Sequence, residues 1–395
     1  MDPGPATTAT VLALRAARIW TNVGEEAAKA IIRRCPMDDT SSTAQSEELL
    51  RLIEAPTIAA ALVVVSDAVR LGQVELALEL VGVIRAKFGA DPGLDLAEVT
   101  ILARKKRFAE AAACLATLRE RSPAFLVPEL YAAQVCVELG ERERAIEILG
   151  AAARRCPDYP GVAGSLASLL MPGPGYRDVL AALHRELRPR GYLEIGVETG
   201  ATLALANATA IVGVDPDLSV LRRDAVHPRT RLFEMKSEDF FRERSAEEVL
   251  LGTPLDLTFI DGMHRYGAAL ADFAAVEQWS HERSVVVMHD ALPVLPIYAE
   301  AERRTRFWVG DVWRAVVGLR VARPELRIRI IATPPSGLVV ITNLRQANAP
   351  LGSFLSVALD AAARADLTER VPPWPRDFPV VRNDLDGIRE AFGPR

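Results

Sequence analysis

Short apolar runs alternate with helix-length segments through the second half of the chain, and this alternation restricts the fold more than any other feature. The runs are Tyr192–Gly196, Ile211–Asp215, Arg231–Met235, Leu255–Asp261 and Ser284–Asp290. Several are almost continuously apolar, as is typical of parallel strands buried on both faces of a sheet. The pattern predicts a doubly wound, Rossmann-like α/β domain, whose ligands bind at the carboxyl ends of the strands.

Two further apolar runs close this region. They are Leu326–Thr333 and Leu338–Asn343, and the turn sequence Pro334-Pro335-Ser336-Gly337 separates them. Two runs joined so tightly predict an antiparallel hairpin. We therefore expect the last strand to enter an otherwise parallel sheet in the antiparallel sense.

The first half of the chain has a 34-residue repeat and no strand-like alternation. Three segments match one another, and the same place in each is held by Ala77, Ala111 and Ala145. A small residue at a fixed position lets two helices approach closely, and the repeat resembles the helix–turn–helix unit of tetratricopeptide proteins. A plain helical bundle with an accidental period is the alternative. The repeat predicts a surface for a protein partner or for self-association as a homo-oligomer.

The sequence predicts four consecutive parts. Residues 1–170 form the helical domain, in which the first 45 residues add one or two helices. Residues 171–176, Met-Pro-Gly-Pro-Gly-Tyr, form a linker, because two prolines and two glycines cannot continue a helix. The α/β domain spans residues 177–345, and residues 346–395 form a tail that wraps a domain or a neighbouring subunit.

Composition excludes several classes of function. At 395 residues the chain is too long for one typical core, and its net charge of −5 offers no basic field for nucleic acid. The four cysteines lack C-x-x-C spacing, which predicts free thiols in a reducing compartment. Residues 1–10 do not resemble a secretory signal, and the most apolar run, residues 55–69, is too short to span a bilayer. We expect a cytoplasmic protein without membrane partners.

Polar and glycine residues follow each of the first three predicted strands. Glu194 to Gly200 reads E-x-G-x-x-x-G, the second strand ends in Asp215, and Ser237-Glu238-Asp239 follows the third. Glycines permit a sharp turn, and a carboxylate at Asp215 can accept both hydroxyls of a ribose. A carboxylate at Asp215 would bind the ribose of NAD equally well. The alternative for Ser237 is a helix N-cap, with Glu238 and Asp239 as acids in the first turn.

These loops, in this order and followed by the hairpin, resemble the class I S-adenosylmethionine (SAM)-dependent methyltransferases. The resemblance places Glu238 and Asp239 where the adenine amino group is contacted, with Phe240 or its neighbour against the ring. It implies that SAM is bound by Glu194, Gly196, Glu198, Gly200, Asp215, Ser237, Glu238, Asp239 and Asp261.

Two of the five histidines follow the fourth and fifth predicted strands. His264 lies three residues after Asp261, and His289 precedes Asp290. Because the carboxyl ends of adjacent parallel strands meet at one edge, we expect these four side chains to lie together. A histidine can take a proton near neutral pH, and carboxylates are suitable ligands for Mg²⁺ or Mn²⁺.

The stretch Ile260-Asp261-Gly262-Met263-His264-Arg265-Tyr266 resembles the I-D-G-x-H-x-Y motif of bacterial small-molecule and sugar O-methyltransferases, some of them metal-dependent. The resemblance implies His264 as the catalytic base beside Asp261. It implies Asp261, His289 and Asp290 as metal ligands, with His289 standing where the family has an acid. The alternatives are that His264 starts a helix and orients Asp261, and that His289 binds a loop carbonyl.

Aromatic and basic residues after the fifth strand are candidates for an acceptor pocket. Trp308 and Trp313 could floor a sugar or aromatic acceptor, or simply anchor the segment on the sheet. Four arginines could bind an anionic acceptor, namely Arg303, Arg304, Arg306 and Arg314.

Together these features predict SAM-dependent methylation of an oxygen on a small hydroxylated acceptor, a sugar or a biosynthetic intermediate. The alternatives are an N-methyltransferase or a protein methyltransferase, an inactive methyltransferase-fold scaffold, and a nicotinamide-dependent enzyme, against which the hairpin argues.

Overall fold

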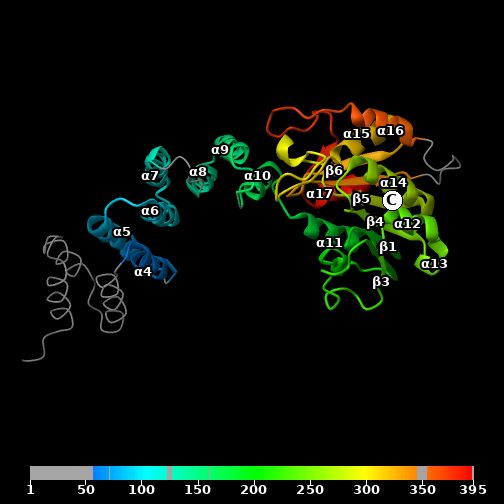
Figure 1. Cartoon of the computed structure of the whole chain (residues 1–395), viewed down its shortest axis with the longest axis horizontal. Helices are drawn as coiled ribbons and strands as arrows, with labels where there is room; N and C mark the ends of the chain where they lie inside the picture. Colours follow the sequence, from blue (N-terminus) through cyan, green and yellow to red (C-terminus); the bar gives the residue numbers. More distant parts are fainter. Residues whose placement is uncertain (1–56, 71, 122–126, 160, 345–353, 394–395) are drawn as a thin grey trace, which may run out of the picture. The chain divides into compact units, whose positions relative to one another are not determined.

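The computed structural model describes residues 57–393 apart from 71, 122–126, 160 and 345–353. Predictions for the first 45 residues, and for Cys35, lie outside the described residues. The chain divides into two compact units, Met1–Ile148 and Leu149–Arg395. Figure 1 shows the elements of both units, and each unit is described by itself.

The described part of the first unit is entirely helical. Its helices are α4 (Ile58–Arg70), α5 (Val74–Phe88), α6 (Pro92–Arg104), α7 (Phe108–Arg121), α8 (Val127–Glu138) and α9 (Arg142–Arg155), the last of which continues into the second unit. From α4 to α8 each helix packs on the next, and α6 also contacts α4 and α8. Contacts are therefore made between near neighbours in the sequence.

The predicted 34-residue period is visible in the turns of this unit. The backbone adopts a positive φ at Gly72 (78°), Lys106 (58°) and Gly140 (79°), and α5, α7 and α9 each begin two residues later. Ala77, Ala111 and Ala145, at the same place in these helices, are 0% exposed. A larger side chain there would push neighbouring helices apart, which is why the repeat keeps alanine.

An eight-stranded sheet forms the centre of the second unit, in the order β3-β2-β1-β4-β5-β7-β6-β8. The strands are β1 (Gly191–Ile195), β2 (Ala210–Asp215), β3 (Arg231–Glu234), β4 (Leu255–Ile260), β5 (Ser280–Met288), β6 (Arg327–Ile331), β7 (Leu338–Thr342) and β8 (Val380–Val381). Strands β1 to β5 pair in parallel, and β7 is antiparallel to both β5 and β6. The predicted α/β domain and its antiparallel hairpin strand are confirmed.

Helices cover this sheet. Residues of α11 (Tyr176–Leu187) and α17 (Leu385–Phe392) join strand residues such as Leu257 and Phe259 in one apolar core. Helix α14 (Tyr266–Trp279) contacts β4 and β5 and packs with α15 (Trp313–Ala322) and α16 (Leu355–Ala363). The remaining elements are α10 (Val162–Leu170), η1 (Leu203–Leu205), α12 (Ser237–Glu243), α13 (Ala246–Leu250) and η2 (Pro296–Tyr298).

The predicted linker is a non-helical segment between α10 and α11, but it lies within the second compact unit. The Thr333 hydroxyl donates to the Pro174 carbonyl at 2.8 Å, and the Tyr176 N–H donates to the Pro334 carbonyl at 3.2 Å. The division between compact units falls earlier, within α9. The segment 171–176 is thus fastened to the turn between β6 and β7.

The predicted tail is integrated into the second unit. Strand β8 pairs in parallel with β6, and Ile388 and Ala391 of α17 are buried in the apolar core. In the part of the chain described by the structure, no helix is both long and apolar enough to cross a membrane. The described cysteines Cys114, Cys136 and Cys156 are unpaired.

Candidate methyl-transfer site

The first glycine loop packs directly on the loop that follows β4. Gly196 has φ +87°, and a Cβ atom added there would lie 2.1 Å from the carbonyl oxygen of Asp261. The Asp261 N–H donates to the Ile195 carbonyl at 2.8 Å. Gly196 is therefore required by contact between two loops of the protein, and this contact ties the predicted cofactor loop to Asp261. At Gly200 an added Cβ would meet Leu221 at 2.5 Å.

Asp215 links the ends of the first two strands. Its Oδ2 accepts the N–H groups of Val197 at 2.7 Å and Glu198 at 2.9 Å, and its Oδ1 accepts that of Asp217 at 2.9 Å. Gly196, Glu198 and Asp215, three of the predicted cofactor residues, are thus brought together at one edge of the sheet. Glu198 is exposed, with φ 47°.

Glu194 lies in the interior. It is 0% exposed, and its carboxyl oxygens accept from the hydroxyls of Tyr192 at 2.6 Å and Thr202 at 2.7 Å. Burial raises the pKa of Glu194 to about 8, although the two hydrogen bonds lower it. Its position fits a role beneath the first loop, bracing that loop through Thr202.

The acids after β3 lie at the start of α12. Lys236 occupies the N-cap position and Ser237 is the first helical residue, so Ser237 does not cap the helix. Glu238 is exposed, and Asp239 forms an ion pair with Arg242. Phe240 is fully buried and contacts the rings of Phe233, Phe241 and Trp279, so a ligand cannot reach it in this arrangement.

Asp272 is a residue that sequence reasoning missed. It is 6% exposed on α14, and its carboxyl is hydrogen bonded to Ser237. Burial raises the pKa of Asp272 to about 6, while that hydrogen bond lowers it. An added Cβ on Gly262 would lie 3.8 Å from Asp272 Oδ2, so this carboxyl lies between the loops after β3 and β4. The signal in the sequence was an acid among the mostly apolar residues of 266–279, where the only other acid is Glu277.

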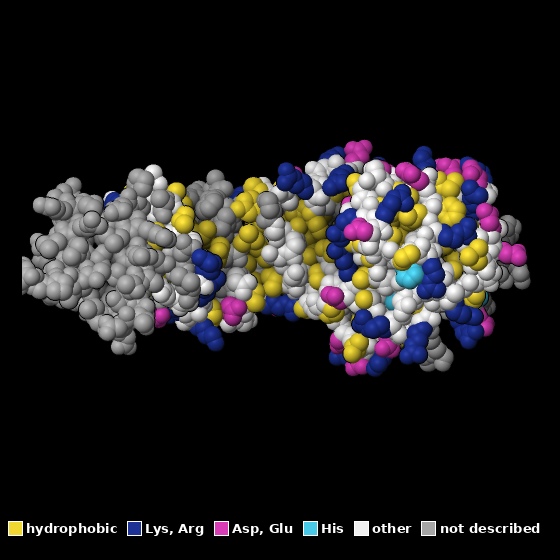
Figure 2. Space-filling view, turned by 90° about the horizontal axis from the view of Figure 1, so that it is seen from below, with side chains coloured by type: hydrophobic (Ala, Val, Ile, Leu, Met, Phe, Trp, Pro, Cys, Tyr) yellow, Lys and Arg dark blue, Asp and Glu magenta, His cyan; other side chains and the backbone are white. Residues whose placement is uncertain are grey.

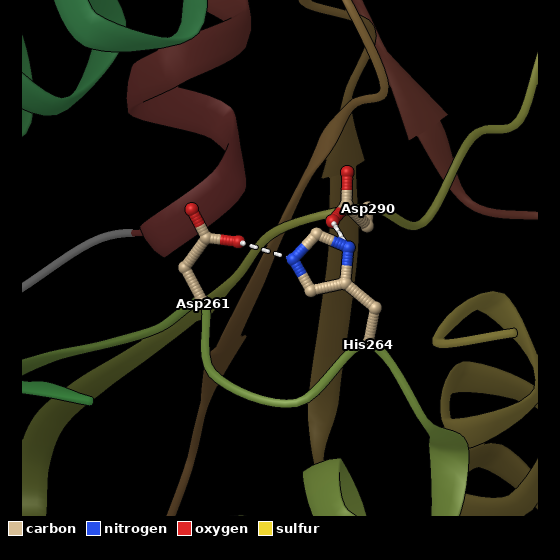
Figure 3. A group of neighbouring side chains, drawn as sticks. All are labelled: Asp261, His264 and Asp290. Atoms are coloured by element: carbon tan, nitrogen blue, oxygen red, sulfur yellow. Dashed lines mark ion pairs between the residues drawn. The ribbon is translucent and has the colours of Figure 1, made fainter. Parts of the chain in front are cut away.

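His264 lies between two carboxylates, as Figure 3 shows. Its Nδ1 is 2.9 Å from Asp290 Oδ2, and its Nε2 is 3.8 Å from Asp261 Oδ1. The Nδ1 and Oδ2 atoms are buried and have no hydrogen bond of good geometry, so their contact is chiefly electrostatic. Burial lowers the pKa of His264, but Asp290 and Asp261 together outweigh this effect and raise it above its usual value. Asp261, His264 and Asp290 thus lie together as predicted.

His289 lies beside the corner formed by Asp261, His264 and Asp290, which we call the catalytic corner, and is nearly fully buried. Its Nδ1 is 3.2 Å from Asp261 Oδ1 and 3.4 Å from Asp290 Oδ1, and its Nε2 is 3.2 Å from Ser336 Oγ. Burial lowers the pKa of His289, yet the charges of Asp290 and Asp261 raise it to about 9. The two carboxylates thus favour the protonated form of His289, whose Nδ1 lies within 3.4 Å of an oxygen of each.

Two further residues complete this corner and were not predicted. Ser336, in the turn between β6 and β7, donates its hydroxyl to Asp290 Oδ1 at 2.6 Å. Tyr176, at the end of the predicted linker, lies with its ring centroid 4.4 Å from that of His289. Asp290 itself has φ 63°, a conformation that aspartate tolerates better than most residues. The hairpin and the linker thus both contribute to positioning His289 and Asp290.

The described residues contain one cluster whose spacing suits a cation. Asp261, His264 and Asp290 each offer one ligand atom, and these atoms lie within 4.8 Å of one another. Together with the buried, poorly satisfied His264 Nδ1 and Asp290 Oδ2, this spacing fits a divalent ion. The histidine in this set is His264, whereas the predicted metal ligand was His289.

The aromatic segment after η2 forms one wall of the corner. The ring of Trp308 stacks on His264, with centroids 5.0 Å apart and planes 9° from parallel, and its Nε1 donates to the Glu300 carbonyl at 2.7 Å. Trp313 is 1% exposed. Of the predicted arginines, Arg303 donates to the carbonyls of Thr305 and Arg306, and Arg304 pairs with Glu300. These two side chains are engaged with neighbouring residues of the same segment.

Comparison with known proteins gives the class of this domain. Residues 193–291, from β1 to just after Asp290, match the family model described as a methyltransferase domain. A comparison with curated proteins finds no match. The second unit therefore contains a methyltransferase domain.

Solved structures similar to the chain include an O-methyltransferase from Bacillus cereus in complex with S-adenosylhomocysteine (SAH), at 15% identity, covering 51% of this chain and 89% of that one, with a TM-score of 0.33. Another is the O-methyltransferase TomG from Streptomyces achromogenes, involved in tomaymycin synthesis and in complex with SAM, at 18% identity, covering 50% and 88%, with a TM-score of 0.34.

Proposed function

We propose that this chain transfers the methyl group of SAM to an oxygen of a small hydroxylated acceptor, a sugar or a biosynthetic intermediate. The observation that carries the proposal is His264, held between Asp261 and Asp290 at the carboxyl ends of β4 and β5. The same edge of the sheet carries the loops expected to hold the cofactor. The methyltransferase match of residues 193–291 supports the reaction class.

The cofactor supplies an electrophilic methyl group on a sulfonium centre. The loop from Gly196 to Gly200 and the carboxylate of Asp215 are the groups that would hold it, with Ser237, Glu238 and Asp239 nearer its adenine. Glu194 would act from below by bracing the first loop through Thr202, to which it is hydrogen bonded at 2.7 Å. Since Gly196 packs on Asp261, the cofactor loop and the catalytic corner are fixed relative to each other.

His264 is the proposed general base. Its Nδ1 is buried against Asp290, which leaves Nε2 to accept the proton of the acceptor hydroxyl. As that proton moves to Nε2, the oxygen lone pair forms a bond to the methyl carbon, the carbon–sulfur bond breaks, and SAH leaves. Asp290 orients the ring and stabilises the imidazolium, as an acid behind a catalytic histidine does.

A divalent cation held by Asp261, His264 and Asp290 is the alternative for this corner. Such an ion would lower the pKa of the acceptor hydroxyl, and His264 would then be a ligand instead of the base. The two arrangements differ in a measurable way. EDTA should inactivate a metal-dependent enzyme and Mn²⁺ should restore it, and Mn²⁺ bound to the protein should lose its free-ion electron paramagnetic resonance signal.

Calorimetry with SAH tests the proposed function before any acceptor is known. We expect SAH to bind and NAD(H) not to bind. Failure to bind SAH would favour a methyltransferase-fold scaffold and overturn our proposal. An N-methyltransferase or a protein methyltransferase would bind SAH too, and would be recognised by transfer of labelled methyl groups to amines or to added protein.

For the first unit we propose a tetratricopeptide-like array that binds a protein partner or a second copy of the chain in a homo-oligomer. The 34-residue recurrence of its turns and buried alanines supports this proposal. The free thiols of Cys114, Cys136 and Cys156 favour the cytoplasm as the location of the protein. Sedimentation analysis of the full chain tests self-association, because a purely monomeric chain at all concentrations would leave only the partner role.

A further inference from the structure

The segment between β5 and α15 is attached to the turn that joins α9 and α10. The Tyr298 hydroxyl donates to the Pro157 carbonyl at 3.0 Å, and the Arg306 N–H donates to Asp158 Oδ1 at 2.5 Å. The partners of these two bonds are 141 and 148 residues apart in the sequence, and all four belong to the second compact unit. Both ends of the stretch 298–306 are therefore bound to two adjacent residues of one turn.

The attachment at Tyr298 is buried. Tyr298 is 0% exposed, and its ring packs edge-on against that of Phe307, with centroids 5.1 Å apart. Burial raises the pKa of the Tyr298 hydroxyl to about 12, and the charge of Asp158 adds to the rise. The hydroxyl therefore stays protonated and donates to Pro157. A buried donor that loses its acceptor is costly, so this bond fixes where η2 lies.

The same segment carries the ring that stacks on the proposed base. The Val309 N–H donates to the Tyr298 carbonyl at 2.9 Å, and Trp308 Nε1 donates to the Glu300 carbonyl at 2.7 Å. The chain thus doubles back on itself, and Trp308 is held both beside its backbone and at its indole nitrogen. Its ring lies on that of His264, with centroids 5.0 Å apart and planes 9° from parallel.

The segment also contacts the backbone of His264. The Asp311 N–H donates to the His264 carbonyl at 3.2 Å, and a Cβ added at Gly310 would lie 1.8 Å from that same oxygen. The His264 ring is further restrained by Asp290, whose Oδ2 is 2.9 Å from Nδ1. A rotation of the ring would change the direction of Nε2, the atom proposed to accept the proton. The plane of the Trp308 ring therefore bears directly on the direction of that atom.

We infer that Asp158 and Tyr298 are positioning residues for the catalytic base. The turn between α9 and α10 holds the segment 298–311, and the Trp308 ring of that segment sets the orientation of the His264 ring. This inference rests on the proposed methyl transfer and extends the parts that it needs to the turn 157–158. Helix α9, which carries the third repeat alanine, ends two residues before that turn, so the end of the repeats leads into the support of the base.

Conservative substitutions separate this role from a merely local one. Tyr298→Phe keeps the ring against Phe307 and removes the hydroxyl alone. Asp158→Ala removes the acceptor of the Arg306 N–H at an exposed position, so no cavity is left. Asp158→Asn keeps an oxygen that can accept this N–H. Tyr159→Phe is the matched control, because it removes from the same turn a hydroxyl that has no hydrogen bond to a described residue.

NMR signals of the His264 ring in the histidine-labelled full chain report the stacking directly. The face of an aromatic ring shifts nearby protons upfield, so Trp308→Leu defines the shift that the stack produces. His264→Ala identifies the signals among those of the five histidines. We expect Tyr298→Phe and Asp158→Ala each to lose most of this shift, and Asp158→Asn and Tyr159→Phe to keep it. A role limited to the stability of the turn predicts easier unfolding with an unchanged shift.

Methyl transfer should fall with the shift, by up to about 10²-fold, because a small displacement at the reacting atoms can have an effect of that size. SAH affinity, measured by calorimetry, should not change. An unchanged shift in both Tyr298→Phe and Asp158→Ala, an equal loss in Tyr159→Phe, or full activity despite a lost shift would overturn the inference. Failure of the unaltered chain to bind SAH would instead overturn the proposed methyl transfer, and the histidine spectra, recorded without SAH, would still report the stacking.

Discussion

The two units treat their buried acids differently. In the first unit, Asp95 is 6% exposed and lies 2.8 Å from Arg85 and 3.0 Å from Arg121. In the second unit, Glu194 and Asp272 are equally buried, yet neither forms an ion pair with a described residue. Two arginines neutralise Asp95 in the helical array, whereas burial raises the pKa values of Glu194 and Asp272 in the sheet unit.

This difference separates structural acids from functional candidates. The sheet unit also has a paired acid, Glu277, which is 1% exposed and 2.7 Å from Arg323, far from the loops that follow the strands. The unpaired acids instead lie at or below those loops. A buried carboxylate without a cation is expensive, so its position at a ligand-binding edge indicates use in binding or catalysis.

The catalytic corner should show the largest effect. His264→Ala is expected to lower turnover by roughly 10²–10⁴-fold, the usual contribution of a general base, with SAH affinity nearly unchanged. Methyl transfer and SAH calorimetry measure the two quantities. His281→Ala is a suitable control, because His281 pairs with Asp256 at the opposite end of β4. Equal activity of His264→Ala and the unaltered chain would remove His264 from the mechanism.

In the helical unit the paired acid should matter for stability alone. Asp95→Ala leaves two arginines without their shared partner and should cost about 1–3 kcal/mol of unfolding free energy, less than for a fully buried pair because both arginines are partly exposed. Hydrogen exchange in α5 to α7 would localise the loss. Glu75→Gln, at an exposed ion pair with Lys105, should leave the unfolding free energy nearly unchanged, because solvent screens the pair. A change in SAH affinity in Asp95→Ala would contradict the distinction between the units.

Asp272 should instead matter for SAH binding. We expect Asp272→Ala to weaken SAH binding by about threefold to tenfold, because it removes the hydrogen bond between α14 and Ser237 at the start of α12. Asp256→Ala makes the same change near the other edge of the sheet and should leave SAH affinity unaltered. If both variants bind SAH equally well, Asp272 serves packing only.

Glu194 should show its effect in the pH dependence of stability. Its pKa of about 8 in the folded protein exceeds the ordinary value of 4.5, so the folded state binds a proton that the unfolded state releases between these values. This contribution to stability is complete below pH 4.5 and is lost as pH rises through 8. Urea unfolding of Glu194→Gln across this range should lack that decline, and identical pH profiles would contradict the pKa assignment.

Most of the sheet was predictable from the sequence because continuous apolar runs mark buried strands one by one. The tail was harder to interpret, since β8 has only two residues and exists through pairing with β6. Asp261, His264, His289 and Asp290 were predictable as neighbours because strand ends meet. Ser336 and Tyr176 were not, because their positions depend on how the hairpin and the linker fold back on the sheet.

The fastening of the predicted linker bears on how the catalytic part could be isolated. A fragment cut at residue 177, where the sequence suggests a domain boundary, would lose the Tyr176 ring from His289 and the Pro174 carbonyl from Thr333. A fragment that keeps the second compact unit from Leu149 retains both. The segment predicted as a linker is therefore an integral part of the second unit, and the choice of cutting point decides whether an isolated domain keeps the contacts around His289 and Thr333.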